Sequence, residues 1–188
     1  MKTTISIISL ILFLSISVFS QTLREKEVFD IVNQVRMYPD SNIVLDDINK
    51  EISTRKRLMK NPNVNVDVNF EDRLVCLEET KQFLLNQSPV DSLVWDSVLY
   101  ERYVKFDITK TESSGKISHT YMELNYSENI IGFGKTPLES VKEFILDCRV
   151  ESKGHRKNIF SDNNKMCVFE NLDSKKSPVN FIQGFTKN

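Results

Sequence analysis

Four side chains stand out for the chemistry they can do: the two histidines of the chain and two carboxylates between them. His119 lies in the stretch ISHT, Glu128 in SENIIGFG, Asp147 in ESVKEFILD and His155 in SKGHRKNIF. Imidazole is the side chain whose ordinary pKa lies nearest neutrality, and it is the commonest metal ligand in proteins. A cleft that held these four side chains could bind a metal ion or move a proton.

The spacing of these residues does not match a compact metal-binding motif. No stretch of the chain resembles HExxH or a zinc finger. Taken alone, two histidines so far apart in sequence favour surface or hydrogen-bonded structural residues over a functional site. A site therefore needs support from the surrounding sequence.

Helices and two strands are predicted around these residues. Apolar periodicity predicts helices over residues 24–37, 46–60 and 71–86, and Asp96 is expected to cap the helix that follows it. Thr136-Pro137-Leu138-Glu139 combines a capping box with proline at the first helical position, and a short helix is expected from Gly154. Strands are predicted at 166–170 and 179–185, whereas the alternating valines of 64–68 are interpreted as a loop.

The phrase SENIIGFG, a helix, and then SKGHRKNIF resembles the CAP superfamily, which contains cysteine-rich secretory proteins, antigen 5 and plant pathogenesis-related proteins. It is most similar to the microbial and protist branch, whose hallmark is an ENI or ENL box followed by GHR-N-I. The first predicted helix also resembles the opening helix of the family, since Asn33, Arg36 and Pro39 match an N-x-x-R-x-x-P pattern. The resemblance covers residues 21–188 and is looser before Leu93.

The resemblance implies one CAP/SCP domain of the α+β class, a three-layer α-β-α sandwich with a small antiparallel sheet. Residues 21–92 would form a helical N-terminal part and residues 93–188 the part that carries the motifs. It also implies that His119, Glu128, Asp147 and His155 line one open cleft. Many family members carry glutamate where this chain has Asp147, so the shorter side chain sets its carboxylate further back.

The family is known chiefly for secreted proteins that bind sterols, other lipids or partner proteins. The resemblance therefore leads us to expect extracellular binding of a lipid, a sterol or a protein ligand, with no catalytic residue assigned. A metal-dependent, protease-like extracellular hydrolase is the alternative. No nucleophile elbow and no serine at a motif position supports it.

If Zn²⁺ binds, the resemblance makes His119 and His155 its expected ligands. Glu128 and Asp147 would then hold water or orient the imidazole rings. Catalytic zinc usually has three protein ligands, so two histidines predict a weak and exchangeable site.

Residues 1–20 have the pattern of a secretory signal peptide. Lys2 precedes an apolar run from Ile5 to Phe19 that is interrupted only by serines, and the cleavage point falls before Gln21. An uncleaved membrane anchor needs about 20 strongly apolar residues, and this run is shorter and diluted by serine. We therefore expect a secreted, extracellular protein without a transmembrane segment after cleavage.

Composition fits one domain without a nucleic-acid partner. The chain has 188 residues, 40% of them apolar, which is enough for a sizeable core. Lys2 is the one charged residue of the leader, so 25 basic residues fall to 24 against 26 acidic ones, a net charge of −2. This near-balance of charge gives no electrostatic reason to expect binding to nucleic acid.

Asn86 and Asn125 stand in N-x-S sequons and are candidate glycan acceptors.

Three cysteines, Cys76, Cys148 and Cys167, allow at most one intrachain bridge. Counting alone does not choose among the three pairings. The implied fold puts Cys148 at the end of the helix opened by Thr136 and Cys167 in the first closing strand, which favours a Cys148–Cys167 bridge in an oxidising compartment. Three buried free thiols are the alternative.

The first prediction concerns export. Cleavage before Gln21 is expected, because the apolar run is too short to anchor the chain. N-terminal sequencing of the protein recovered from the medium of its host should begin at or near Gln21. Retention of Met1 in a membrane fraction would contradict the prediction.

Overall fold

The computed structural model describes residues 21–64, 66–105, 126–132, 136–171 and 181–187. His119 and Asn125 lie outside these residues. The described helices are α2 (Leu23–Met37), α3 (Ile43–Met59), α4 (Val68–Asn86), α5 (Ser97–Lys105), α6 (Pro137–Leu146) and α7 (Gly154–Ile159). The described strands are β1 (Val94–Trp95), β2 (Tyr126–Ile131), β3 (Lys165–Glu170) and β4 (Phe181–Thr186).

The four strands form one mixed sheet in the order β1-β3-β4-β2. β3 and β4 pair in antiparallel fashion, as do β4 and β2, whereas β1 runs parallel to β3. The expected sheet was purely antiparallel, and the parallel pair is a correction. It arises because the chain leaves β1 into α5 and returns to the sheet much later, so β1 and β3 are not joined by a hairpin. Helices combined with this small sheet agree with the α+β class.

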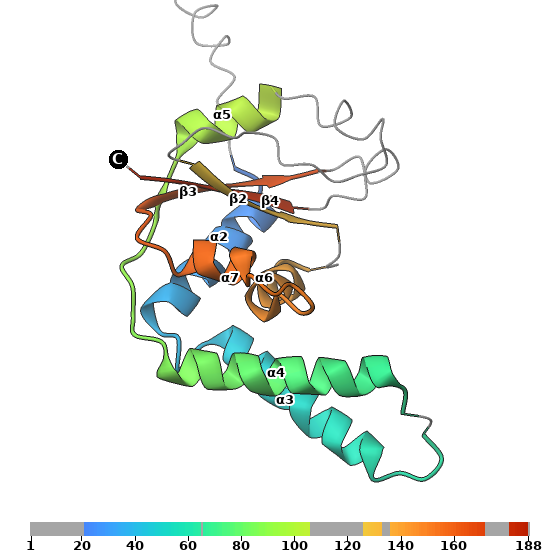
Figure 1. The fold of residues 1–188 in the computed structure, drawn as a ribbon. Coiled ribbons are helices and arrows are strands. Elements are labelled where there is room, and N and C mark those ends of the chain that lie inside the picture. Colours follow the sequence, from blue (N-terminus) through green and yellow to red (C-terminus); the bar gives the residue numbers. More distant parts are fainter. Residues whose placement is uncertain (1–20, 65, 106–125, 133–135, 172–180, 188) are drawn as a thin grey trace, which may run out of the picture.

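Helices lie on both faces of the sheet (Figure 1). α5 covers one face, where it contacts β3. α2, α6 and α7 lie on the other face, and the pair α3 and α4 lies beyond them. None of the helices in the described residues is long and apolar enough to span a lipid bilayer.

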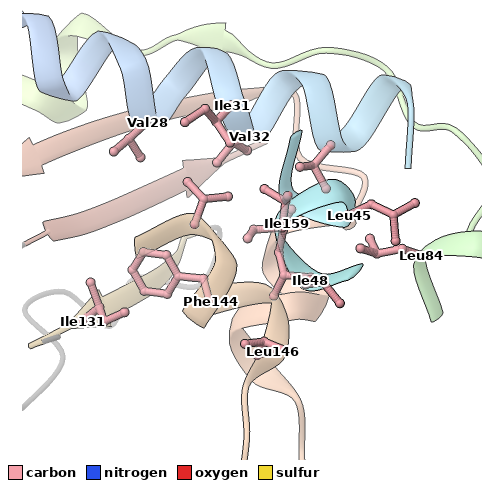
Figure 2. Close-up of a cluster of buried hydrophobic side chains, with 14 of the residues drawn as sticks. Val28, Ile31, Val32, Leu45, Ile48, Leu84, Ile131, Phe144, Leu146 and Ile159 are labelled. Atoms are coloured by element: carbon pink, nitrogen blue, oxygen red, sulfur yellow. The ribbon is translucent and has the colours of Figure 1, made fainter. Parts of the chain in front are cut away.

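Two groups of buried apolar side chains follow from this arrangement. The larger group lies between the sheet and α2, α3, α4, α6 and α7, and Figure 2 shows its central members, such as Val32, Ile48 and Phe144. The smaller group lies under α5 and contains Leu99, Tyr100, Tyr103, Cys167 and Ile182.

Gly184 permits the close approach of α5 to the sheet. A Cβ added at this position would lie 2.8 Å from side-chain atoms of Leu99 and Tyr103. Contacts this short are repulsive, so a larger residue in β4 would push α5 away from the strand.

Side-chain caps determine where the helices begin. Thr136 and Glu139 form the predicted capping box of α6, with Pro137 at the start of the helix. α3 and α4 begin earlier than predicted, because Asn42 accepts a hydrogen bond from the N–H of Leu45 and Asp67 accepts one from the N–H of Phe70. The predicted cap of α5 is confirmed, since Asp96 accepts a hydrogen bond from the N–H of Leu99 at 2.9 Å.

The disulfide joins Cys76 of α4 to Cys148, which follows α6, with their Cα atoms 5.9 Å apart. The predicted Cys148–Cys167 bridge is therefore wrong, and so is the alternative of three free thiols. Successive side chains of a strand point to opposite faces of the sheet. Met166 and Val168 face the larger core, so Cys167 between them faces α5 and is a buried free thiol. It lies on the opposite face of the sheet from Cys148.

Arg36 ties the first helix to the second half of the chain. Its side chain is fully buried and donates hydrogen bonds to the carbonyl oxygens of Asp91, Ile159, Ser161 and Asn163. Asn33, one turn earlier, bonds both backbone groups of Leu93. The N-x-x-R pattern thus orders the backbone before β1 and at the end of α7.

Arg36→Met should lower the free energy of unfolding by about 3 kcal/mol, because buried carbonyl oxygens lose their donors. Urea unfolding followed by the fluorescence of Trp95, the one tryptophan of the chain, measures the loss. Arg57→Met is the matched control, since Arg57 is exposed on α3, and its effect should stay within about 0.5 kcal/mol. Equal effects of the two substitutions would contradict the assigned role of Arg36.

Candidate functional site

Asp147 and His155 form a hydrogen-bonded pair. His155 Nδ1 lies 2.9 Å from Asp147 Oδ1, and the backbone N–H of His155 donates to Asp147 Oδ2 at 2.9 Å. The Asp147 side chain is 1% exposed, whereas that of His155 is 30% exposed. A neutral imidazole that donates from Nδ1 carries its lone pair on Nε2. In the described part of the chain the ring has no hydrogen-bond partner other than Asp147, so Nε2 is available to a ligand.

The charge on Asp147 is stabilised by its partner. Burial of the carboxyl group raises its pKa, but the hydrogen bonds from the His155 ring and backbone and the positive charge of a protonated imidazole outweigh this effect. The net result is a pKa of Asp147 below its usual value. Asp147 is therefore a carboxylate at neutral pH and fixes both the tautomer and the direction of the ring.

A tight connection between α6 and α7 brings the pair together. Asp147 ends α6 in the left-handed conformation, with φ 46° and ψ 42°. Its carbonyl oxygen accepts a hydrogen bond from the N–H of Val150 at 3.2 Å, and the carbonyl oxygen of Val150 accepts one from the N–H of Lys153 at 3.1 Å. These turns reverse the chain so that His155, in the first turn of α7, faces Asp147.

Buried amide side chains connect the two sequence motifs. Asn129 of the ENI box donates to the carbonyl oxygen of His155 at 3.1 Å and to Gln183 Oε1 at 3.0 Å. Asn158 of GHRKNI donates to Asn129 Oδ1 at 2.8 Å and to the carbonyl oxygen of Glu128 at 3.3 Å. The asparagines therefore attach α7, and with it His155, to the edge strand β2.

Glu128 points away from this pair. Its neighbour Asn129 faces α7, so the alternation of a strand places the Glu128 side chain on the α5 face. There Glu128 is buried and accepts a hydrogen bond from the hydroxyl of Tyr103 at 2.8 Å. Burial, and then the nearby charge of Glu128, raise the pKa of Tyr126, whose hydroxyl also points at this carboxylate.

The four residues singled out in the sequence thus have different outcomes. The structure brings Asp147 and His155 together and places Glu128 on the other face of the sheet, while His119 lies outside the described residues. Across the described ranges, no group of three or more histidine, cysteine, aspartate or glutamate side chains is arranged to hold a metal ion. Both carboxylate oxygens of Asp147 are hydrogen-bonded to His155. Of the atoms of this pair, His155 Nε2 is therefore the one that could bind a metal ion.

Sequence reasoning missed Arg156, the residue after His155. Its guanidinium is buried, bonds the carbonyl oxygens of Ile145 and Leu146, and forms an ion pair with Glu79 of α4 at 2.6 Å. No local pattern in the sequence marked Arg156 as buried, since it stands between His155 and Lys157.

Comparisons of this chain with models of known protein families, with curated proteins and with solved structures found no match.

Asp147→Asn should lower the free energy of unfolding by about 2 kcal/mol at pH 7, because charge-assisted hydrogen bonds contribute roughly 1.5–3 kcal/mol. The pKa of Asp147 is lower in the folded chain than in the unfolded chain. The native chain should therefore exceed the variant in free energy of unfolding by the full amount above about pH 3.9, the usual pKa of the carboxyl group. This difference should disappear as the pH falls through the pKa of Asp147 in the folded chain. Urea unfolding of both proteins at a series of pH values from 7 downwards measures the difference.

Asp40→Asn is the matched control for this titration. Asp40 is exposed and bonds the hydroxyl of Ser41 at 3.3 Å, so its effect should stay within about 0.5 kcal/mol. A penalty for Asp147→Asn that does not change with pH would show that the carboxylate charge plays no part.

Proposed function

We propose that this chain is a secreted CAP-type protein that binds an extracellular ligand, a lipid or a sterol, at the surface around His155. The observation that carries the proposal is the orientation of the His155 ring by a buried aspartate, with Nε2 left for a ligand. A surface histidine needs no such partner, whereas a histidine that must present one nitrogen in a fixed direction does.

The arrangement of the motifs supports the family assignment. The ENI and GHRKNI motifs, distant in sequence, meet through Asn129 and Asn158. Helices on both faces of a small sheet suit an α-β-α sandwich (Figure 1). The Cys76–Cys148 disulfide supports secretion through an oxidising compartment.

The oriented ring nitrogen of His155 suits a ligand that carries a hydroxyl group. The imidazole contacts the Phe144 ring edge-on, with ring centroids 5.5 Å apart. A neutral Nε2 accepts a hydrogen bond from a hydroxyl, as the hydroxyl group of a sterol would offer.

A metal-dependent hydrolase is the second candidate, and the same pair favours it. An aspartate that holds a histidine in one tautomer is also how general bases are oriented. In the described part of the chain no serine, threonine or cysteine bonds the His155 ring. If zinc binds, His155 Nε2 and His119 would hold it, and the ion would act as a Lewis acid toward the substrate. Glu128 takes no part in this proposal, because its carboxylate lies on the other face of the sheet.

Binding of a fluorescent sterol and of a fluorescent fatty acid tests the proposal. Saturable binding is expected for the native chain, and His155→Gln should weaken it at least tenfold because the substituted amide is not held by Asp147. The matched control is Lys157→Ala, an exposed position on the same helix, which should bind like the native chain. Binding unchanged in His155→Gln, or no saturable binding by the native chain, would contradict the proposal.

The same samples separate the hydrolase candidate from the binding protein. Mass spectrometry of the bound lipid should recover it unchanged, with and without added zinc. Turnover of an ester substrate that requires zinc and disappears in His155→Gln would establish the enzyme instead.

A further inference from the structure

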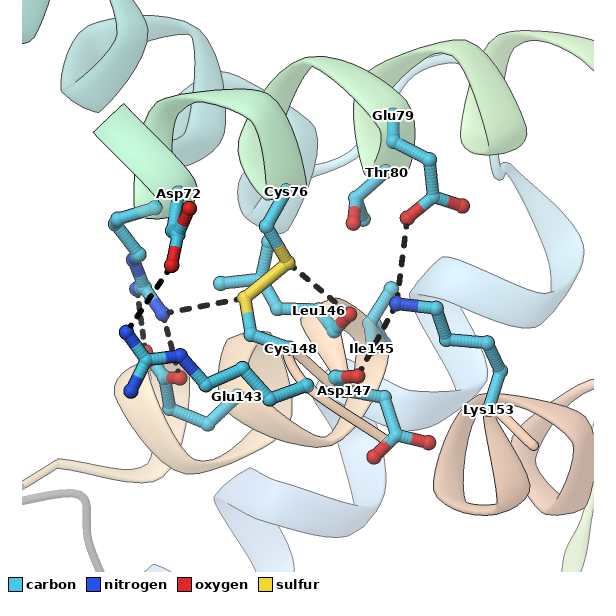
Figure 3. Close-up of a disulfide and its surroundings, with 12 residues drawn as sticks. Asp72, Cys76, Glu79, Thr80, Glu143, Ile145, Leu146, Asp147, Cys148 and Lys153 are labelled. Atoms are coloured by element: carbon cyan, nitrogen blue, oxygen red, sulfur yellow. Dashed lines mark hydrogen bonds and ion pairs between the residues drawn. A yellow bond between two sulfur atoms is a disulfide. The ribbon is translucent and has the colours of Figure 1, made fainter. Parts of the chain in front are cut away.

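The disulfide lies directly beside the Asp147–His155 pair. Cys148 is the next residue after Asp147, and its partner Cys76 belongs to α4. Figure 3 shows the bridge spanning from α4 to the end of α6, with the Asp147 carboxylate just beyond it. Any movement of Cys148 therefore acts on Asp147 through one peptide bond.

The segment that follows the bridge holds a strained backbone. Asp147, Arg149 and Lys153 have φ values of 46°, 63° and 50°. Elsewhere in the described ranges, no residue other than glycine has a positive φ. Such conformations are costly for residues with a side chain, and they persist where the surrounding structure imposes them.

α4 holds both ends of this segment. At the start, Cys76 binds Cys148 covalently. At the end, Glu79, one turn further along α4, pairs with Arg156 at 2.6 Å and with Lys153 at 3.5 Å. If the covalent attachment is lost, Asp147 keeps its hydrogen bonds with His155 and Lys153, but the bridge no longer imposes the left-handed conformation on it.

The bridge is accessible to a reagent. Both cysteines are partly exposed and line a cavity of about 590 Å³ between α4 and the segment 148–153. The lining also includes Val75, Arg73 and Lys153. The volume admits an incoming thiol, and disulfides that solvent reaches are the ones open to exchange.

The charges around the sulfur atoms favour one direction of attack. Arg73 Nη1 lies 3.9 Å from Cys148 Sγ. The other cations that line the cavity are paired, Arg149 with Asp72 and Lys153 with Glu79, so this preference depends on Arg73. Cations stabilise a thiolate, and exchange is faster when the leaving sulfur is a stable thiolate. Cys148 is thus the favoured leaving group and Cys76 the favoured point of attack.

We propose that the Cys76–Cys148 disulfide is a redox switch whose reduction by a dithiol releases Asp147 and so disorganises the His155 site. A thiolate of the dithiol attacks Cys76 Sγ, the S–S bond breaks, and its electron pair leaves on Cys148 as a thiolate. The second thiol of the dithiol loses its proton to water, attacks the dithiol's own sulfur in the mixed disulfide and expels Cys76 as a thiolate, which takes a proton from water. The protein gains two electrons, and the dithiol becomes a disulfide.

The consequence for ligand binding rests on the proposed function, but the switch itself does not. In the oxidised protein His155 Nδ1 lies 2.9 Å from the Asp147 carboxylate, so the neutral form of the ring that this contact favours carries its lone pair on Nε2. In the reduced protein this tautomer should lose its preference. The ¹⁵N chemical shifts of imidazole distinguish the two tautomers directly, without any ligand. With two histidines in the chain, a His119→Gln variant assigns the signals.

The chain offers an internal control for unfolding. Cys167 is a buried free thiol, and burial raises its pKa well above the usual value, so a reagent reaches it only when the chain opens. Native protein is treated with dithiothreitol in the absence of denaturant, quenched with an alkylating agent, and analysed by peptide mass spectrometry. Alkylation of Cys76 and Cys148 should be at least tenfold faster than alkylation of Cys167. Equal rates would mean reduction through global unfolding and would overturn the proposal.

Two variants test the role of the charges. Arg73→Gln should slow the reduction at least threefold, because the leaving thiolate of Cys148 loses its nearest cation. Lys142→Gln is the matched control, since Lys142 shares the partner Glu51 with Arg73 but does not line the cavity. It should change the rate less than twofold. Equal slowing by both substitutions would overturn the assigned direction of attack.

The imidazole spectrum decides the final step. Reduction should change the ¹⁵N shifts of His155 towards a mixture of tautomers, and reoxidation should restore them. Unchanged His155 shifts in a fully reduced, folded protein would overturn the switch. An oxidised protein that shows the expected shifts and their loss on reduction, yet binds no sterol or fatty acid, would leave the switch established and contradict the proposed function.

Discussion

The buried guanidinium of Arg156 is the interaction on which the candidate site depends. The last carbonyl groups of a helix lack partners within it, and Arg156 supplies donors to those of Ile145 and Leu146 at the end of α6. Its charge is balanced by Glu79 of α4, and its plane lies over the Phe83 ring at 4.7 Å. One side chain therefore joins α4, α6 and α7, and the residue before it is His155.

A second polar centre holds the outer helices in place. Glu51 of α3 accepts hydrogen bonds from Arg55, from Arg73 of α4 and from Lys142 of α6. Burial raises the pKa of Glu51, but the hydrogen bonds from Arg73 and Lys142 and their charges lower it to about 2. The carboxylate thus stays charged at any physiological pH. Because α4 also carries Cys76 and Glu79, this centre helps to position the helix that clamps the segment before His155.

The two faces of the sheet have different chemistry. Beneath α5, two buried carboxylates accept hydrogen bonds from tyrosine hydroxyls, Glu25 from Tyr100 at 2.9 Å and Glu128 from Tyr103 at 2.8 Å. These contacts fasten α5 to the start of α2 and to β2. The opposite face carries the amide contacts of Asn129 and the Asp147–His155 pair. In this sheet Glu128 is a structural residue that joins α5 to the edge strand.

The sequence by itself determined the helices, their starts and the closing strands, because caps and periodicity act over a few residues. The Thr136 capping box, the Asp96 cap and the loop conformation of Val64 and Val66 are legible without tertiary structure, whereas Val68, which was expected in that loop, begins α4. The earlier starts of α3 and α4 were also encoded locally, in Asn42 and Asp67. The cysteine pairing and the separation of Glu128 from His155 were decided by the tertiary structure alone. Each depends on which face of the sheet a strand residue occupies, and that is set by register and by which helix covers each face.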